Sequence, residues 1–508
     1  MFDSIRKKIG DILLATALLI LLAIPFALNP ERKKKKTTGS EADEKLIIIS
    51  PHWEGVRHEF ERGFKLYFFR EFGKSIDIEW LNVGGTADIV KFIGSEFARN
   101  HSTIGVDLVY GGGIEAHMHM ADRGYLSPVD LPEGVFDHIP KTLFGMRVND
   151  AQSRWFSAAL SGFGIIYNRP VLKKLSISPP ETWEDLARPE MLTWVGSGDF
   201  RYSGSTHMVY EIILQAYGWR RGFSIIMRMG ANIRSFSRSS TDVPRDTALG
   251  EIACGMALDS YAWNQIARIG EERLGYVLPP KLTIINPDAV AILKGAPNKE
   301  AAAKFIQYVL SLEGQSLWML APKKRVGLTK RDPNARNITA DPTNQKHTSI
   351  NELVGPHRFA LTRMSVRRDI YKMLKGKTPV KINPFSWKGS FEYDDQKASK
   401  RWDIINNLLG AALIDNHDRL QALWRELIQA GLPSHLVNEL TKPPISEDEL
   451  MRTAERWNKD PKYRSHLRVK WVKHFRDLYN KIATKLEDIK NTGSPKGKGC
   501  TGCIGCSR

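Results

Sequence analysis

Short apolar runs and amphipathic stretches alternate along the first part of the chain. Apolar, β-branched runs at residues 45–50, 76–81 and 106–110 predict three buried strands. Apolar residues at helical spacing predict helices over residues 56–72 and 87–97, between those strands. Strands that alternate with helices at short intervals favour a parallel α/β sheet, whose loops gather at the carboxyl ends of the strands.

A second alternating unit begins with a strand-like run at residues 156–167 and continues to about residue 275. A further strand is expected at residues 284–293, followed by an amphipathic helix over residues 300–312. Beyond residue 356 the periodicity is helical and no comparable strand pattern appears. The helices expected there cover residues 402–412, 419–430, 447–457 and 470–489.

The N-terminus carries an apolar stretch at residues 12–28, preceded by Arg6, Lys7 and Lys8. A basic start followed by an apolar run is the layout of an export signal, and the length approaches that of a membrane span. We interpret it first as an uncleaved anchor and second as a cleaved signal. The cations at residues 32–36 oppose this topology, because the positive-inside rule would keep the body in the cytoplasm.

The formal net charge of +18 invites a nucleic-acid interpretation, but much of the excess lies between residues 351 and 508. No zinc-finger spacing, RNA-binding aromatic strand or phosphate loop accompanies it, so no nucleic-acid partner is predicted. A basic, solvated surface on the helical region is the simplest interpretation. An anionic membrane surface or an acidic partner remains an alternative.

Two groups of residues suggest metal chemistry at first sight. Cys500, Cys503 and Cys506 could chelate zinc or an iron–sulfur cluster, although a flexible tail without a structural role is the competing interpretation. His117 and His119 lie two residues apart, so on a helix they face different directions and cannot readily share an ion. Cys254, alone in an apolar run, is expected to be a small buried hydrophobe.

Small hydroxyl residues precede two of the expected helices in the second unit. Ser203, Ser205 and Thr206 surround a glycine where a helix begins, so backbone and side-chain donors converge on one point that suits an anion. Simple N-capping explains the same pattern. Ser240 and Thr241 repeat the arrangement before the next helix, where Asp242 favours a cation or an amine instead.

Strand ends supply the remaining candidate residues, because ligands of open α/β sheets bind at the carboxyl edge. His52, Thr86 and the glycines at residues 111–113, including Gly112 and Gly113, follow strands of the first unit. Tyr261 follows the apolar run at residues 253–258 of the second unit, although plain packing would also explain it. The motifs of the common enzyme classes are missing from the sequence, so no catalytic residue is predicted.

Eight short segments carry a further signal through their order and spacing. They are 108–113 (LVYGGG), 164–168 (GIIYN), 180–186 (PETWEDL), 203–208 (SGSTHM), 238–245 (RSSTDVPR), 250–255 (GEIACG), 286–288 (NPD) and 293–298 (LKGAPN). Together they resemble the extracellular solute-binding proteins of bacterial ABC importers, most closely the ferric-ion, phosphonate and thiamine branch. The similarity covers roughly residues 46–315.

The resemblance implies a type II periplasmic-binding fold, α/β in class, with two lobes, two crossover strands and an added, mainly helical C-terminal region. It places the first lobe at residues 46–154 and 283–355, and the second at 155–282. The other expected segments are an anchor or signal (1–30), a linker (31–45), the helical region (356–490) and a tail (491–508).

The resemblance also implies a protein outside the cytoplasm, anchored to the cytoplasmic membrane or secreted, which captures a small solute and delivers it to a permease. The solute is expected to be ferric ion or a small organic anion such as a phosphonate. Iron would be a transported ligand rather than a cofactor, held by His52 and Tyr261. Ferric members use two adjacent tyrosines, whereas Tyr261 is followed by Ala262 and Trp263, which puts iron in doubt. A membrane-attached sensor and, less favoured, a secreted hydrolase remain the alternatives.

Overall fold

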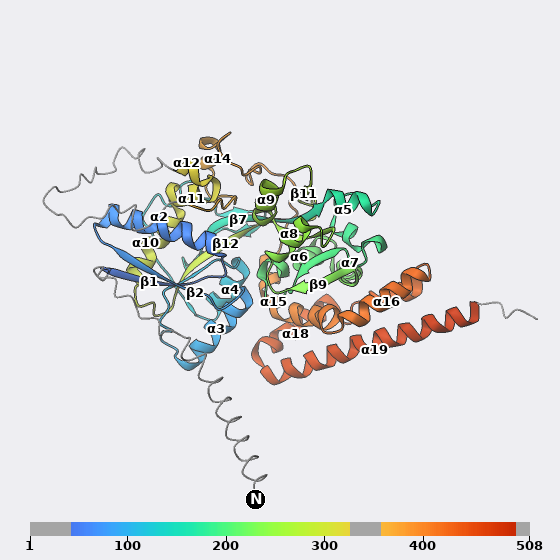
Figure 1. Cartoon of the computed structure of the whole chain (residues 1–508). Coiled ribbons are helices and arrows are strands. Elements are labelled where there is room, and N and C mark those ends of the chain that lie inside the picture. Colours follow the sequence, from blue (N-terminus) through green and yellow to red (C-terminus); the bar gives the residue numbers. More distant parts are fainter. Residues whose placement is uncertain (1–41, 326–356, 494–508) are drawn as a thin grey trace, which may run out of the picture. The chain divides into compact units, whose positions relative to one another are not determined.

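The computed structural model describes residues 42–325 and 357–493 (Figure 1). Its contacts divide the chain into two units, Met1–Asp43 and Glu44–Arg508, and the fold described below is that of the second unit. The apolar N-terminal stretch and the three C-terminal cysteines fall outside the described residues. Within the described residues, every helix is too short or too polar to span a membrane.

The first lobe is built around three parallel strands, as the alternating pattern predicts. Strand β1 (Glu44–Ile49) lies between β2 (Ile76–Leu81) and β3 (Leu108–Tyr110). The aromatic stripe of the first helix is buried, because Phe60, Phe64 and Phe68 are all fully inaccessible. Burial of each phenylalanine stabilises the lobe by about 1.5–3 kcal/mol. The helices of this lobe are α2 (Glu54–Phe72), α3 (Thr86–Arg99), α4 (Ile114–Asp122), α10 (Lys299–Leu310), α11 (Leu312–Met319) and α12 (Pro322–Arg325).

Two long strands connect the lobes, and both are buried along their whole length. Strand β7 (Phe156–Asn168) pairs with β12 (Ile285–Leu293), which in turn pairs with β3 of the first lobe. Strand β7 also pairs with β10 (Cys254–Leu258) of the second lobe. The sheet therefore runs in the order β2-β1-β3-β12-β7-β10-β8-β9, where β8 is Val195–Gly198 and β9 is Ile233–Ser237. This mixed sheet with two crossover strands confirms the predicted α/β fold of type II periplasmic binding proteins.

The second lobe continues the sheet with β8 (Val195–Gly198) and β9 (Ile233–Ser237), which lie parallel to each other. Strand β11 (Leu274–Val277) also belongs to this part of the sheet and pairs antiparallel with β7. The helices that cover this part are α5 (Arg169–Lys174), α6 (Gly204–Ala216), α7 (Trp219–Asn232), α8 (Asp242–Leu249) and α9 (Asp259–Ile269).

The structure differs from the expected boundary at residue 356. Between residues 357 and 394 the chain forms only one short helix, α14 (Asp369–Met373). Hydrophobic residues from Phe359 to Trp387 pack in the core of the first lobe instead of starting a helical region. Met364 bridges to Leu160 of β7, and Leu361 and Val366 are buried in the same core. We call residues 357–366 the strap. The conformation of the strap is fixed by contacts with residues that are distant in the sequence. A local pattern of polar and apolar residues does not reveal such contacts.

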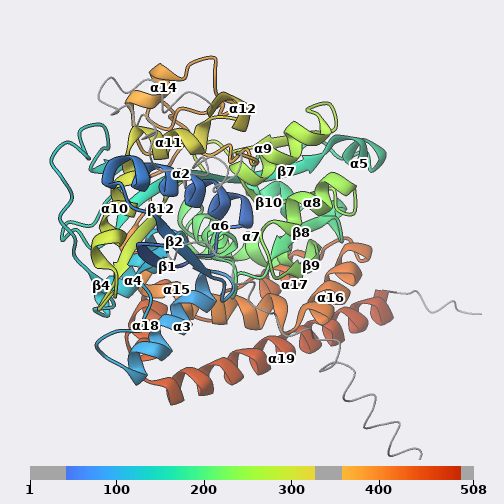
Figure 2. The same ribbon diagram turned by 60° about the vertical axis from the view of Figure 1, so that its left-hand side comes forward.

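The expected C-terminal helices are present and pack against the second lobe (Figure 2). The side chain of Trp424 is buried there, and its Nε1 donates to Oδ1 of Asn232 on α7 at 2.9 Å. The first helix of the set also contacts α4 of the first lobe. The helices are α15 (Asp395–Leu409), α16 (His417–Gln429), α17 (Ser434–Leu440), α18 (Glu447–Lys459) and α19 (Pro461–Gly493).

Candidate functional site

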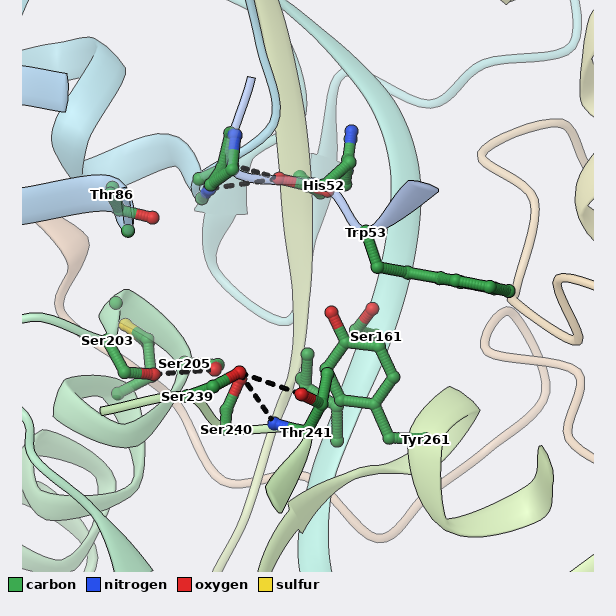
Figure 3. A pocket seen from close by; sticks show the side chains of 18 of the residues that line it. His52, Trp53, Thr86, Ser161, Ser203, Ser205, Ser239, Ser240, Thr241 and Tyr261 are labelled. Atoms are coloured by element: carbon green, nitrogen blue, oxygen red, sulfur yellow. Dashed lines mark hydrogen bonds and ion pairs between the residues drawn. The ribbon is translucent and has the colours of Figure 1, made fainter. Parts of the chain in front are cut away.

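A cavity of about 420 Å³ lies between the two lobes and is lined by residues of both. Figure 3 shows His52 and Thr86 of the first lobe on one side, and Ser203, Ser205 and Tyr261 of the second lobe on the other. The predicted site residues that line it are His52, Thr86, Gly112, Gly113, Ser203, Ser205, Ser240, Thr241 and Tyr261.

The remaining predicted residue, Thr206, lies behind the cavity wall. Its hydroxyl donates to Oγ of Ser203 at 3.0 Å, and its amide donates to the same oxygen at 3.2 Å. Thr206 therefore holds Ser203 in place and does not itself face the cavity. The hydroxyl of Ser203 also lies 3.2 Å from that of Ser205, which lines the wall.

In the part of the chain that the structure describes, six helices have their N-termini at the cavity. This convergence is the main feature of the cavity's geometry. The first-turn amides of a helix have no intrahelical partner, and the helix dipole adds partial positive charge there. At the start of α6, the amides of Gly204 and Ser205 have no hydrogen-bond partner among the described residues. The N-cap residues concerned are Trp53 (α2), Gly85 (α3), Gly113 (α4), Ser203 (α6), Thr241 (α8) and Leu258 (α9).

The lobes approach each other closely at two glycines. A Cβ placed on Gly85 would lie 2.2 Å from the carbonyl oxygen of Tyr202 across the cleft. A Cβ on Gly204 would lie 2.9 Å from Oγ1 of Thr86. Since real Cβ atoms do not make such contacts, glycine at these positions lets the start of α3 meet the start of α6.

Asp288 of β12 accepts hydrogen bonds from two backbone amides of the triple glycine. Its Oδ1 accepts from the amides of Gly112 at 2.6 Å and Gly113 at 3.0 Å. Residues 111–113 all have positive φ, and a Cβ on Gly111 would meet the ring of His52 at 2.7 Å. The glycines thus shape the wall of the cavity, and the amides of Gly112 and Gly113 hold the carboxylate of Asp288 in place.

Arg363 of the strap completes this cluster, and sequence reasoning missed it. Its Nη1 lies 2.7 Å from Oδ2 of Asp288, and its Nε donates to Oγ of Ser161 at 2.7 Å. Nε2 of His52 lies 2.8 Å from the same carboxylate oxygen. The Arg363 guanidinium also faces the ring of Trp318, with 5.2 Å to the centroid.

The protonation states of the cluster follow from burial and charge. Burial lowers the pKa of His52 and outweighs the opposite effect of Asp288, so the imidazole is neutral. Burial alone would raise the pKa of Asp288, but the charge of Arg363 and the contact with His52 hold it far below its usual range. The cluster is therefore one carboxylate paired with one guanidinium, with no net charge.

Two observations concern His52 and Tyr261, the residues predicted to hold ferric ion. Nε2 of His52 is taken by Asp288, and burial raises the pKa of Tyr261, which disfavours the phenolate that Fe(III) prefers. Over residues 42–325 and 357–493, no three His, Cys, Asp or Glu side chains are grouped so that they could hold an ion.

Cationic side chains that have no carboxylate partner in the described structure also reach the cavity. Arg57 lines it from the first lobe, and Arg238 lines it from the second, with its guanidinium 4.8 Å from the ring centroid of Tyr202. The carboxylate of Asp88 is engaged with the amide of Gly85 at the start of α3. The uncompensated charge at the wall is therefore positive.

Two other sequence features lie apart from the cavity chemistry. His117 is fully buried and its Nδ1 bonds to the carbonyl of Gly113, while burial lowers the pKa of His119 to about 4. Burial raises the pKa of Cys254 to about 12, so its thiol is not reactive. The lining residues that sequence reasoning missed include Arg57, Ser161, Arg238, Asn286, Asp288 and Arg363.

Solved structures with the same fold are periplasmic binding proteins. The periplasmic binding protein P5PA matches with a TM-score of 0.53 at 18% identity, over 70% of this chain and 95% of that protein. The apo ferric ion-binding protein A of Pasteurella haemolytica matches with a TM-score of 0.50 at 14% identity, over 72% of this chain and 96% of that one.

Curated relatives cover less of the chain. The phosphoglycerate transport regulatory protein PgtC of Salmonella typhimurium is 26% identical over 213 residues, 42% of this chain and 51% of the relative. An uncharacterised Haemophilus influenzae protein is 26% identical over 257 residues, 49% of this chain and 70% of the relative. The chain thus spans about half the length of the PgtC relative.

Residues 105–329 match the model of a protein family described as bacterial extracellular solute-binding protein. Part of each lobe and both crossover strands fall inside this match, as do the starts of α4, α6, α8 and α9 at the cavity. The family and the structural neighbours consist of binding proteins rather than enzymes. Residues 105–329 are therefore similar to the bacterial extracellular solute-binding proteins, and the fold of the chain is that of periplasmic binding proteins.

Proposed function

We propose that this protein captures a small organic anion carrying a phosphate or phosphonate group and delivers it to an ABC permease. The observation that carries the proposal is the convergence of six helix N-termini on one cavity between the lobes. Helix N-termini bind phosphate and carboxylate groups through unpaired amides and the positive end of the dipole. Ser203, Ser205 and Thr241 add hydroxyl donors at the same wall.

The charges of the wall support an anion over a metal ion. Arg57 and Arg238 supply positive charge, whereas the one buried carboxylate of the cluster, Asp288, is already paired with Arg363. A cation would need carboxylate or phenolate oxygens that are free to bind it. The name of the Salmonella relative refers to phosphoglycerate transport, which agrees with a phosphate-bearing solute.

A thermal-unfolding screen of the purified protein tests this proposal. The panel holds 3-phosphoglycerate, methylphosphonate, a hexose phosphate, Fe(III) citrate, thiamine and a polyamine. A ligand at a hundredfold its dissociation constant adds about 2.7 kcal/mol to the free energy of unfolding. We expect a stabilisation by one or more phosphorus-bearing compounds, reduced when Arg57 or Arg238 is replaced by methionine. Stabilisation by Fe(III) citrate alone would point to the ferric alternative.

A role in sensing is the second candidate, and two observations favour it. The relative's name describes a regulatory protein, and α15 of the added helical region contacts helices of both lobes, α4 and α6, each of which begins at the cavity. A deletion strain separates the two roles. A transport component is required for uptake of labelled solute, whereas a sensor is required for solute-dependent transcription and not for uptake.

A further inference from the structure

The strap places a fixed positive charge at the wall of the ligand cavity. Residue 363 lies beyond the part of the chain that matches the family model, residues 105–329. The backbone around it is tied to the first lobe and to the crossover strand. The amide of Arg363 donates to the carbonyl of Trp318 at 2.9 Å, and the carbonyl of Met364 accepts from Leu160 at 2.9 Å.

The two residues that follow in the strap are also held by hydrogen bonds to the first lobe. Ser365 donates its hydroxyl to Oε1 of Gln315 at 2.7 Å, and Val366 donates its amide to the same oxygen at 3.0 Å. Gln315 in turn donates to the carbonyl of Ala158 on β7 at 2.7 Å. Anchored on both sides, Arg363 has little freedom to leave its partners, and its side chain is only 10% exposed.

The guanidinium occupies the position that a cationic ligand would take. Oδ2 of Asp288 lies 2.7 Å from its Nη1, and the lone-pair-bearing oxygen of Ser161 lies 2.7 Å from its Nε. Without Arg363, the carboxylate of Asp288 would be a buried negative charge at the cavity wall, facing the cleft together with the imidazole of His52. Carboxylate and imidazole are both ligands of divalent metal ions.

We infer that Arg363 is a specificity-determining residue: its guanidinium fills the cation position against Asp288 and so reserves the cavity for anions. The inference deepens the proposed function and rests on it for the anionic solute. If the inference is right, the preference of the cavity for negatively charged ligands depends on the balance of charge between Arg363 and Asp288. Removal of the Arg363 guanidinium should make the cavity bind cations. Removal of the Asp288 carboxylate should strengthen its preference for anions.

The first arm of the test measures the binding of Co²⁺ by equilibrium dialysis. The full chain is used, with its accessible thiols alkylated so that Cys500, Cys503 and Cys506 do not chelate the ion. We expect Arg363→Met to bind Co²⁺ at least tenfold more tightly than the wild-type protein. The controls are Arg363→Lys, which keeps the charge, and the double variant Asp288→Asn/Arg363→Met, which removes both charges. Neither control is expected to gain Co²⁺ binding.

The second arm uses Asp288→Asn, which keeps the shape of the side chain and does not depend on the folding of Arg363→Met. The amide oxygen introduced at position 288 can still accept from the amides of Gly112 and Gly113, while Arg363 loses its counter-ion. We expect the affinity for methylphosphonate to rise about tenfold. If the wild-type protein binds methylphosphonate, an unchanged or lower affinity of Asp288→Asn would overturn the inference. Equal Co²⁺ binding by wild type and Arg363→Met, or by Arg363→Met and the double variant, would overturn it whether or not the anion binds.

The two arms separate this inference from the proposed function. If the wild-type protein and Asp288→Asn bind no anion while Arg363→Met gains Co²⁺ binding, the proposed solute class is wrong but the role of Arg363 stands. If wild type binds phosphorus-bearing anions and neither variant changes its preference, the proposed function stands and the inference about Arg363 is wrong.

Discussion

Arg401 on α15 and Glu211 on α6 form an ion pair with both side chains fully buried, and the Nη2–Oε1 distance is 2.7 Å. Arg401 also contacts Glu447 of α18 at 2.5 Å. Burial alone would raise the pKa of Glu211, but the charge of Arg401 outweighs burial and lowers it. The pair joins the added helical region to the very helix whose N-terminus, at Ser203, faces the ligand cavity.

Removing one partner of this pair is expected to destabilise the protein strongly. Arg401→Met leaves the carboxylate of Glu211 buried without its counter-ion, which costs about 3–5 kcal/mol of unfolding free energy. Urea unfolding measures the loss. The double variant Glu211→Gln/Arg401→Met serves as the control and is expected to recover much of it, because no uncompensated charge remains. A loss below about 1 kcal/mol in Arg401→Met would show that the pair does not hold the helical region to the lobe.

Glu115 of α4 predicts a pH-dependent difference in stability. Burial raises its pKa to about 7, above the ordinary 4.5, and Oε2 has no hydrogen-bond partner among the described residues. The folded protein therefore binds a proton that the unfolded chain releases, so this group's contribution to stability falls as the pH rises from about 4.5 to about 7.

Glu115→Gln isolates that contribution, because Oε1 can still accept from Nδ2 of Asn286, which lies 2.9 Å away. We expect the variant and the wild type to be about equally stable near pH 4.5. Above pH 7 the variant should be more stable by up to about 3 kcal/mol. Other buried titrating groups, such as Asp259 and His207, contribute equally to both proteins. A difference in unfolding free energy that does not change with pH would contradict the raised pKa.

Ser203 is expected to serve both stability and binding. Its Oγ accepts from the amide of Thr206 at 3.2 Å and lines the cavity, whereas Ser311 caps α11 in the same way, with the amide of Gly314 at 3.1 Å, away from it. Replacing either serine by alanine should cost about 1 kcal/mol of stability. Only Ser203→Ala should also weaken the binding of a phosphorus-bearing anion, measured by calorimetry. Equal affinities of the two variants for the anion would show that Ser203 does not contribute to binding.

Gly85 is expected to control how closely the lobes approach. A Cβ at this position would lie 2.2 Å from the carbonyl oxygen of Tyr202, so Gly85→Ala should hold the lobes apart and weaken ligand binding more than tenfold. Gly94→Ala on the same helix is the control, because its Cβ would make only an ordinary 3.9 Å contact with Tyr125. That variant should keep its affinity and gain up to about 1 kcal/mol of stability. The same affinity in both would show that the close approach is not needed.

Much of the fold and part of the site could be predicted from the sequence. Apolar, strand-like runs located the strands β1, β2, β3, β7 and β12, and a helix start rich in hydroxyls located Ser203 and Ser205. These features are local, because a strand or a helix cap leaves its pattern within a few neighbouring residues. The rule that ligands meet the carboxyl ends of strands then brought His52 and Thr86 to the same cleft.

The residues that sequence reasoning missed depend on contacts between distant parts of the chain. Arg363 lies in a strap without helical or strand periodicity, and nothing near it in the sequence signals the 2.7 Å contact with Asp288. Asp288 lies within an apolar crossover strand; the segment 286–288 (NPD) carries part of the resemblance, but nothing in it marks the carboxylate as a site residue. The bond between Asp288 and the amides of Gly112 and Gly113 was missed for the same reason, since the carboxylate is about 175 residues away from them in the sequence.

The most direct test of the central claim is equilibrium dialysis of the wild-type protein against a phosphorus-bearing anion and against Fe(III) citrate, each alone and both together, with the thiols alkylated. If the helix N-termini form an anion site, one molecule of 3-phosphoglycerate or methylphosphonate is retained per chain. Iron is then not retained, and it does not displace the anion. Retention of one iron per chain, with no retention of either anion, would contradict the account.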